Sequence, residues 1–289
     1  MASFARRLEN NVSGDFFVDS SCIDCETCQW LAPESFAAGD GTSRVWRQPS
    51  GNGDRLRAER ALIACPVGAI GTEEPHDFSA AQAAFPNPID GDVRHCGYHA
   101  ETSYGAASYL IVRPEGNVLV DSPRFTTPLV GRIEALGGIR LMLLTHCDDV
   151  ADHRRFHDHF GCERVMHERD VRHGTCDVEI KIDTNDAVEL FDGGTLIPAP
   201  GHTSGSMCLH YADKFLFSGD HMAWDPETRH VAAFRDYCWF DWTLLLASAR
   251  KLLAYEFEWL LPGHGHPIQL PVTRMRAEIE QFLTQEGDT

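Results

Sequence analysis

Four cysteines near the N-terminus form the first pattern that could bind a metal. Cys22, Cys25 and Cys28 follow a C-x2-C-x2-C spacing, and Cys65 stands far downstream in the sequence ACPVGAI. Three thiolates on one tight loop can bind three corners of an iron–sulfur cube, and a remote Cys-Pro can supply the fourth ligand. A structural zinc site is the alternative, although such sites usually pair two separated C-x2-C knuckles. The spacing therefore favours an iron–sulfur cluster over a zinc site.

Histidine and aspartate side chains form a second pattern, which begins in the sequence THCDDVADH. There His146, Asp148, Asp149, Asp152 and His153 fall within eight positions. Imidazole and carboxylate groups are the ligand types of zinc, iron and manganese. Three further candidates each follow an apolar run in the same way: His202 in PGHTSGS, Asp220 in FLFSGDHM and His264 in LLPGHGHP. We expect these chain segments to converge on one metal site.

Short apolar runs that alternate with helical patterns must position these side chains. The runs that predict strands are residues 107–112, 117–121, 139–146, 195–202, 214–220 and 258–265. Helical patterns cover residues 127–136, 149–160 and 241–257, and a last helix opens at Pro271 with Val272, Met275, Ile279 and Phe282 on one face. Strands alternating with helices predict an α/β fold, in which sites form at strand ends.

A stretch rich in Pro, Ala and acidic residues, at about residues 73–92, separates the two patterns. It lacks periodic apolar residues and is typical of a linker. The predicted organisation is therefore a cysteine-bearing domain at 1–75, a linker at 76–94 and a larger domain at 95–289.

The first 70 or so residues resemble the single-cluster bacterial ferredoxin domain, through C-x2-C-x2-C together with CPVGAI. The resemblance implies a small α+β domain. It also implies one [4Fe-4S] cluster held by Cys22, Cys25, Cys28 and Cys65.

Residues 95–289 resemble the metallo-β-lactamase fold, because THxxxxDH, PGHT, SGD and PGHG appear in the family's order. The resemblance implies an αββα sandwich that binds one or two divalent ions, of zinc, iron or manganese. The ligands that it implies are His146 and His202 for the first metal, Asp152, His153 and His264 for the second, and Asp220 between the two.

One departure from the family pattern concerns the first metal. The family has H-x-H-x-D-H, whereas here CDDVA separates His146 from the Asp152-His153 pair, so the second histidine is absent. Asp148 stands at the right distance to replace it, and Asp149 could do so if the loop bulges. An acid at this position is similar to the di-iron branch of the superfamily.

Composition limits the possible partners and the compartment. The chain has 289 residues, 43% of them hydrophobic, and a formal net charge of −18. This charge repels phosphate backbones and anionic lipid surfaces, so we expect no nucleic-acid partner and no membrane partner. The sequence shows neither a spanning segment nor a secretory h-region, which predicts a cytoplasmic protein with free thiols.

Two enzymatic functions and one binding function fit these residues. The first is a hydrolase that acts on an ester, thioester or lactone, with Asp152 orienting a metal-bound hydroxide and the cluster serving as a switch or an electron carrier. The alternative is a di-iron oxidoreductase that receives electrons from the cluster and acts on O2, NO, a peroxide or a sulfur substrate. An external reductase or carrier would then supply the electrons. A non-catalytic iron–sulfur sensor is the third. Both enzymes would take a small-molecule substrate.

Aromatic residues crowd the segment after Asp220. They could line a substrate pocket or contact the ferredoxin domain, but core packing is the favoured prediction. These residues are Trp224, Tyr237, Trp239, Phe240 and Trp242.

Overall fold

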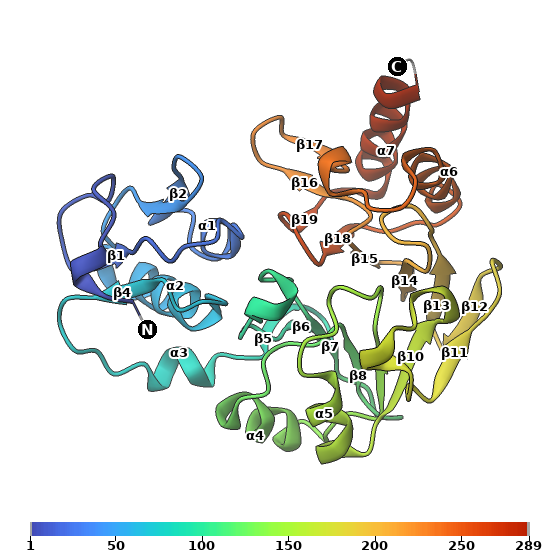
Figure 1. The fold of residues 1–289 in the computed structure, drawn as a ribbon, viewed down its shortest axis with the longest axis horizontal. Coiled ribbons are helices and arrows are strands. Elements are labelled where there is room, and N and C mark those ends of the chain that lie inside the picture. Colours follow the sequence, from blue (N-terminus) through green and yellow to red (C-terminus); the bar gives the residue numbers. More distant parts are fainter. Residues whose placement is uncertain (1, 288–289) are drawn as a thin grey trace. The chain divides into compact units, whose positions relative to one another are not determined.

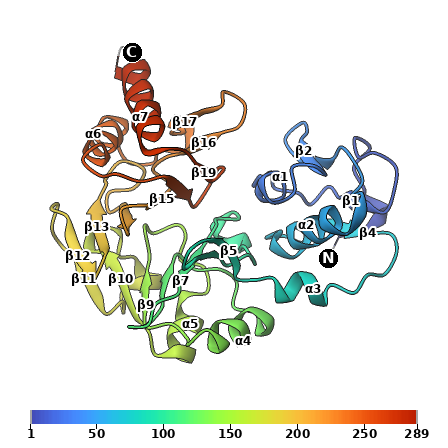
Figure 2. The ribbon, with the colours of Figure 1, turned by 180° about the vertical axis from the view of Figure 1, so that it is seen from behind.

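The computed structural model describes residues 2–287 and divides into two compact units. Unit 1 contains the residues up to 140 together with 151–161, and unit 2 contains 141–150 together with the residues from 162 onward. Figures 1 and 2 show the helices and strands of each unit from two opposite sides. None of the described helices combines the length and apolar character needed to cross a bilayer.

The N-terminal part of unit 1 is a small α+β arrangement. Strand β1 (Phe16–Val18) pairs antiparallel with β4 (Ile70–Thr72), and β2 (Phe36–Ala38) pairs with β3 (Ser43–Val45). Helix α1 (Thr27–Leu31) packs against the longer α2 (Gly51–Ala64), as Figure 1 shows. A short 3-10 helix, η1 (Phe4–Arg6), precedes them.

The rest of unit 1 is an antiparallel meander with flanking helices. Its strands, paired in chain order, are β5 (Asn87–Asp90), β6 (Val93–His95), β7 (Tyr109–Ile111) and β8 (Val118–Val120). The helices are α3 (Ser79–Ala83), η2 (Glu101–Ser103), α4 (Thr127–Ala135) and α5 (His153–Phe160). The stretch predicted as a linker thus contains α3 and β5.

Unit 2 contains strands of two sheets. In the first, β9 (Leu141–Leu143), β10 (Glu163–His167) and β11 (Ile180–Ile182) run parallel. The second sheet has the order β12 (Val188–Phe191), β13 (Gly194–Pro198), β14 (Met207–Tyr211), β15 (Phe215–Gly219), β18 (Trp259–Pro262) and β19 (Ile268–Gln269). The remaining elements are η3 (Glu168–Asp170), η4 (His173–Thr175), the hairpin β16 (Ala223–Asp225) and β17 (His230–Ala232), η5 (Arg235–Tyr237), α6 (Trp242–Leu252) and α7 (Val272–Gly287).

Helices α6 and α7 build the core of unit 2 with the second sheet, and they lie side by side in Figures 1 and 2. Asp241 caps α6 by accepting a hydrogen bond from the Leu244 amide at 2.9 Å. The predicted apolar face of α7 is confirmed at Met275, Ile279 and Phe282, which are buried against sheet residues such as Leu216 and Leu260. Amphipathic periodicity therefore identified this packing correctly.

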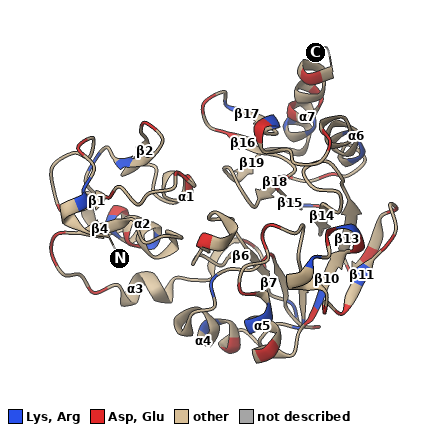
Figure 3. Ribbon diagram, viewed as in Figure 1, with Lys and Arg blue, Asp and Glu red and all other residues tan. Residues whose placement is uncertain are grey.

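Charged residues lie along both units (Figure 3). Blue and red positions are scattered over the ribbon. Acidic residues outnumber basic ones, 43 to 25, which gives the net charge of −18. One pair includes a buried arginine: the Arg164 side chain donates from Nη2 to Glu179 Oε1 at 2.7 Å and from Nε to Glu179 Oε2 at 3.0 Å. Burial acts to raise the pKa of Glu179, but the Arg164 guanidinium outweighs it and lowers this pKa from 4.5 to about 2.

We expect Glu179→Gln to lower the free energy of unfolding by about 2 kcal/mol at pH 7, because it removes the main counter-charge and two charge-assisted hydrogen bonds of the buried Arg164 side chain. A depressed folded-state pKa contributes stability above the unfolded value of 4.5, and this stability is lost as the pH falls toward about 2. Urea unfolding at pH 7 and pH 3 measures both effects, with the exposed Glu189→Gln as the control. If Glu179→Gln lowered the free energy of unfolding equally at both pH values, the Arg164–Glu179 ion pair would not be the cause.

Candidate metal centres

The four N-terminal cysteines line one cavity of unit 1, together with apolar residues of β1 and the chain after Cys65. The loop that carries the first three turns tightly, because Asp24 and Glu26 adopt left-handed conformations with φ of 55° and 59°. Three of the cysteines come from this loop and the start of α1, and Cys65 follows the last residue of α2. Residues distant in sequence are thus brought together as the spacing predicts.

The chemistry of this cavity fits an iron–sulfur cluster. The amide of Ala69 points at Cys65 Sγ at 3.2 Å, and the amide of Ser43 points at Cys22 Sγ at 3.4 Å. Amide donors to sulfur are among the features that tune such clusters. Burial raises the pKa of Cys25 to about 11, so a thiolate there requires a cationic partner such as iron.

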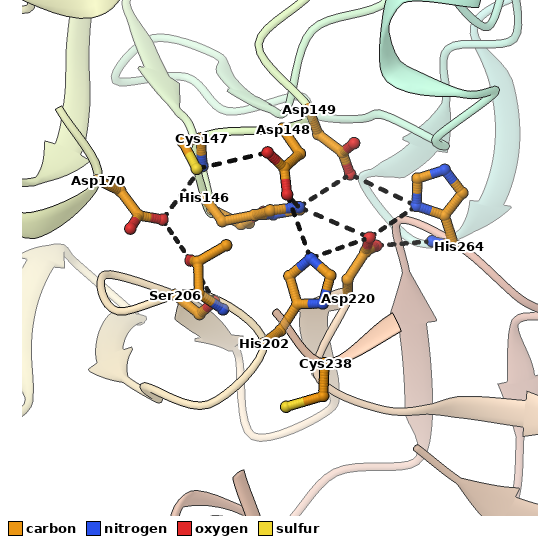
Figure 4. Close-up of polar contacts among 12 residues, drawn as sticks. His146, Cys147, Asp148, Asp149, Asp170, His202, Ser206, Asp220, Cys238 and His264 are labelled. Carbon is orange, nitrogen blue, oxygen red and sulfur yellow. Dashed lines mark hydrogen bonds and ion pairs between the residues drawn. The ribbon is translucent and has the colours of Figure 1, made fainter. Parts of the chain in front are cut away.

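The histidine and aspartate candidates of unit 2 lie at the ends of its strands. Strands β13, β15 and β18 run in the same direction, because β14 is antiparallel to both β13 and β15, and β15 is parallel to β18. Their carboxyl ends therefore meet at one edge of the sheet, where the chain places His202, Asp220 and His264. The loop after β9 adds His146, Asp148 and Asp149 to the same site (Figure 4).

The centre of the site consists of two histidines and two carboxylates. His202 Nε2 lies 3.5 Å from Asp148 Oδ2 and 3.6 Å from Asp220 Oδ2. His146 Nε2 lies 4.0 Å from Asp148 Oδ2 and 3.6 Å from Asp220 Oδ2. Donors bound at about 2.1 Å to one tetrahedral ion lie about 3.4 Å apart, so these separations fit a shared metal.

The buried nitrogen of His202 provides a second test of this fit. His202 is 4% exposed, and among residues 2–287 its Nε2 makes no hydrogen bond, although the Asp148 and Asp220 carboxylates lie 3.5 and 3.6 Å away. A buried ring nitrogen without a hydrogen bond costs free energy unless a ligand satisfies it. Three of the central side chains, His146, Asp148 and His202, form a group whose donor atoms all lie within 4.8 Å of one another. The donor set is therefore suited to a divalent ion.

Both aspartates that could replace the missing histidine approach the site. Asp149 Oδ2 lies 3.8 Å from His146 Nε2 and 3.9 Å from His264 Nδ1, and Asp149 is 1% exposed. A second group of potential ligands comprises His146, Asp149 and Asp220. Asp148 lies on the side of His202, and Asp149 lies on the side of His264 (Figure 4). The loop between His146 and Asp152 is two residues longer than in the family pattern, and it presents both carboxylates to the site, where the sequence alone left the choice open.

Asp152 and His153 belong to unit 1. Asp152 Oδ2 accepts a hydrogen bond from the Phe125 amide at 2.7 Å and lies 3.4 Å from Arg155 Nη1. His153 is the first residue of α5 and is 3% exposed. Their assignment as ligands of a second metal, and that of Asp152 as the catalytic group, therefore remain predictions.

The Asp220 carboxylate and the His264 ring interact electrostatically at the centre of the site. Burial acts to raise the pKa of Asp220, but His264 and His146 outweigh it and lower this pKa well below its usual range. Burial likewise acts to lower the pKa of His264, whereas Asp220 and Asp149 raise it to about 10. His264 Nδ1 lies 2.8 Å from Asp220 Oδ2, and the His264 amide donates to Asp220 Oδ1 at 3.0 Å. His264 therefore orients the Asp220 carboxylate from two points.

Asp170 supports the site, although the sequence analysis did not identify it. This fully buried residue ends η3, just after β10. Its carboxylate accepts from the Cys147 amide at 3.1 Å, from the Gly205 amide at 2.8 Å and from the Thr203 hydroxyl. Asp170 thus joins the loop of His146 to the loop of His202, as Figure 4 shows in part. Its position after an apolar run was the only sequence signal.

The core-packing prediction is wrong for three of the aromatic residues. Tyr237, Trp239 and Phe240 are 61%, 63% and 53% exposed. The amides of Trp239 and Phe240 donate to the carbonyl of His202 at 2.9 and 3.1 Å, and the Trp239 ring lies 6.3 Å from the His202 ring. Trp239 and Phe240 therefore stand beside the candidate metal site, and the Tyr237 ring lies 6.2 Å from the Trp239 ring. We call these three residues the aromatic border; exposed apolar groups of this kind often mark a binding surface.

A metal titration tests this proximity. We expect Co²⁺ added to metal-depleted protein to quench tryptophan fluorescence, because a paramagnetic ion at His202 would lie close to the Trp239 ring. Trp239→Phe should remove most of the quench. Trp46→Phe, which alters an exposed tryptophan of unit 1, is the control. A full quench in the Trp239 variant would place the ion elsewhere.

Comparison with known families gives two matches, which do not overlap along the chain. Residues 18–72 match the family described as the 4Fe-4S single cluster domain of Ferredoxin I. Residues 103–264 match the metallo-beta-lactamase superfamily. No curated protein sequence matches the chain.

Solved structures confirm the predicted α/β fold class. TMB-1 aligns with a TM-score of 0.53 and 15% identity, over 70% of this chain and 97% of its own. The metallo-β-lactamase FIM-1 from Pseudomonas aeruginosa, in its mono-zinc form, aligns with a TM-score of 0.52 and 15% identity, over 70% and 95%. The B3 metallo-β-lactamase BLEG-1 aligns with a TM-score of 0.51 and 19% identity, over 68% and 97%. At these identities the likeness concerns the fold alone.

Proposed function

The chain belongs to the metallo-β-lactamase superfamily and carries a single-cluster ferredoxin domain, and from this premise we propose that it is a metal-dependent oxidoreductase. In this proposal a non-haem iron site in unit 2 transforms a small molecule, and a [4Fe-4S] cluster delivers the electrons. The substrate class comprises electron acceptors such as dioxygen, nitric oxide, a peroxide or a sulfur compound.

The observation that carries this proposal is the ligand set His146, Asp148 and His202. Two histidines and one carboxylate on one side of an ion, with the other positions open, are typical of non-haem iron enzymes. Asp149 and Asp220 add two more carboxylates within 4 Å of His146 Nε2. Hard oxygen ligands of this kind favour iron or manganese over zinc.

The chain's own residues prepare this site for substrate. A bound ion would supply a Lewis acid and, as iron, a one-electron redox centre. His264 holds the Asp220 carboxylate in place, and Asp170 holds the two ligand loops together. The aromatic border offers flat apolar surface beside His202, which suits a substrate with an apolar part.

The ferredoxin domain supports a redox function because covalent fusion gives the electron donor a high effective concentration. A [4Fe-4S] cluster transfers one electron at a time, so an external reductase or carrier must reload it. The same fusion has no evident physical advantage for a hydrolytic reaction, which consumes no electrons.

Hydrolysis of an ester, thioester or lactone is the second candidate. It is favoured by the second group of potential ligands, His146, Asp149 and Asp220, which shares His146 with the first group. Two ions that share such a site can activate water and polarise a carbonyl together. The metal that the protein acquires decides between the two candidates.

Elemental analysis of anaerobically purified protein, with EPR after dithionite reduction, provides this test. Our proposal expects about four irons in the cluster and about one or two at the histidine–aspartate site. Asp148→Ala should remove the iron at the histidine–aspartate site and leave the EPR signal of the cluster intact. About four irons together with zinc at the second site would overturn the proposal and favour hydrolysis.

A further inference from the structure

Residues beyond the ferredoxin match pack directly on the cluster-binding loop, within the same compact unit. The Tyr104 hydroxyl donates to the carbonyl of Ile23 at 2.6 Å. The ring of His99 lies 3.2 Å from the Thr27 hydroxyl, and its amide donates to Ala64 at 3.2 Å. The chain after the β6 strand therefore packs against the loop and the helix ends that carry the four cysteines.

Gly105 makes the closest of these approaches. A Cβ at this position would lie 2.7 Å from Cys25 Cβ and 3.0 Å from Cys25 Sγ, and φ is +89°. Only glycine satisfies both conditions without strain. Tyr98 and Tyr104 also adopt left-handed conformations, with φ of 49° and 47°. Strained backbone of this kind concentrates at functional sites, which suggests a role beyond simple packing.

Arg124 brings a positive charge to the same place. Its Nη2 donates to the carbonyl of Cys65 at 3.2 Å and to the carbonyl of Ile63 at 3.0 Å. Two backbone contacts fix its position: the Arg124 amide donates to Tyr98 at 2.8 Å, and the following amide of Phe125 donates to Asp152 at 2.7 Å. A half-buried arginine is thus held against a residue that is itself a predicted cluster ligand.

A negative charge on Cys65 favours the charged form of Arg124. Burial lowers the pKa of Arg124, and the negative charge of Cys65 acts in the opposite direction. Arginine nevertheless stays protonated in proteins. Reduction adds one electron to a cluster and makes it more negative, so a nearby cation stabilises the reduced form more than the oxidised form.

We infer that Arg124, which lies outside the ferredoxin match, completes the cluster site as a positioning residue and raises the midpoint potential of the cluster. The inference rests on the proposed binding of a [4Fe-4S] cluster by Cys22, Cys25, Cys28 and Cys65. It does not depend on the reaction at the histidine–aspartate site. Electrons enter the cluster from an external one-electron donor, and Arg124 makes this transfer more favourable.

A redox titration of the full-length chain tests the inference. The cluster is reduced stepwise with dithionite in the presence of mediators, and its EPR signal gives the midpoint potential. Arg124→Gln should shift the potential to a more negative value, because it removes the charge and keeps a donor group. Arg124→Lys should stay close to wild type, because it restores the charge. Arg132→Gln, in which an exposed arginine of α4 is replaced, serves as the control and should leave the potential unchanged.

The outcomes distinguish a charge effect from a structural one. Arg124→Gln could lose its cluster altogether. The test then depends on Arg124→Lys: a full iron content and a midpoint potential equal to that of the wild type support the charge effect. A cluster potential that is the same in the wild type and in Arg124→Gln would overturn the inference, as would a wild-type chain that binds no cluster. A shifted potential in a protein without oxidoreductase activity would refute the proposed function alone.

Discussion

Asp220→Ala is expected to empty the histidine–aspartate site and to abolish turnover. The Asp220 carboxylate lies 3.6 Å from both His146 Nε2 and His202 Nε2 and accepts from His264 at two points. A bound ion supplies several kcal/mol of transition-state stabilisation, so its loss should lower kcat/KM by a factor of about 10³ or more. Metal content by mass spectrometry and steady-state kinetics measure the two effects.

Asp186→Ala provides the matched control, because Asp186 is exposed in unit 2. It should retain both metal and activity. The cluster of the Asp220 variant should also be intact, since its cysteines lie in unit 1. An Asp220→Ala protein with unchanged metal content would refute the ligand assignment, whatever reaction the enzyme catalyses.

Cys65→Ser should remove the fourth cluster ligand, and it separates the two candidate reactions. Serine lacks the thiolate that iron–sulfur clusters require, so the visible absorption and the EPR signal of the reduced cluster should disappear. In an oxidoreductase, turnover with reduced methyl viologen as the electron donor should fall below detection. In a hydrolase, the reaction should continue, provided that the variant folds.

Circular dichroism and the metal content of the histidine–aspartate site show whether the Cys65 variant has folded. Cys176→Ser is the control, because Cys176 is exposed and lies outside the cluster cavity. A folded Cys65→Ser protein that keeps full activity with the viologen donor would contradict electron delivery by the cluster.

The sequence by itself determined most of the local features. Short apolar runs predicted β7, β8, β9, β13, β15 and β18, and the helical patterns predicted α4, α5, α6 and α7. The motif spacing predicted that four cysteines share one cavity and that His146, His202, Asp220 and His264 converge. These predictions succeed because apolar periodicity and ligand spacing are local properties of the sequence and depend little on distant contacts.

Only the tertiary structure decided how distant segments complete each site. The choice between Asp148 and Asp149 depended on the path of an inserted loop, and the loop presents both. Local patterns did not indicate that Arg124 reaches the Cys65 carbonyl or that Asp170 joins two loops, and they favoured core packing for Trp239, which is exposed beside His202. Each of these contacts links residues more than twenty positions apart, and such contacts are set by packing, which local patterns do not encode.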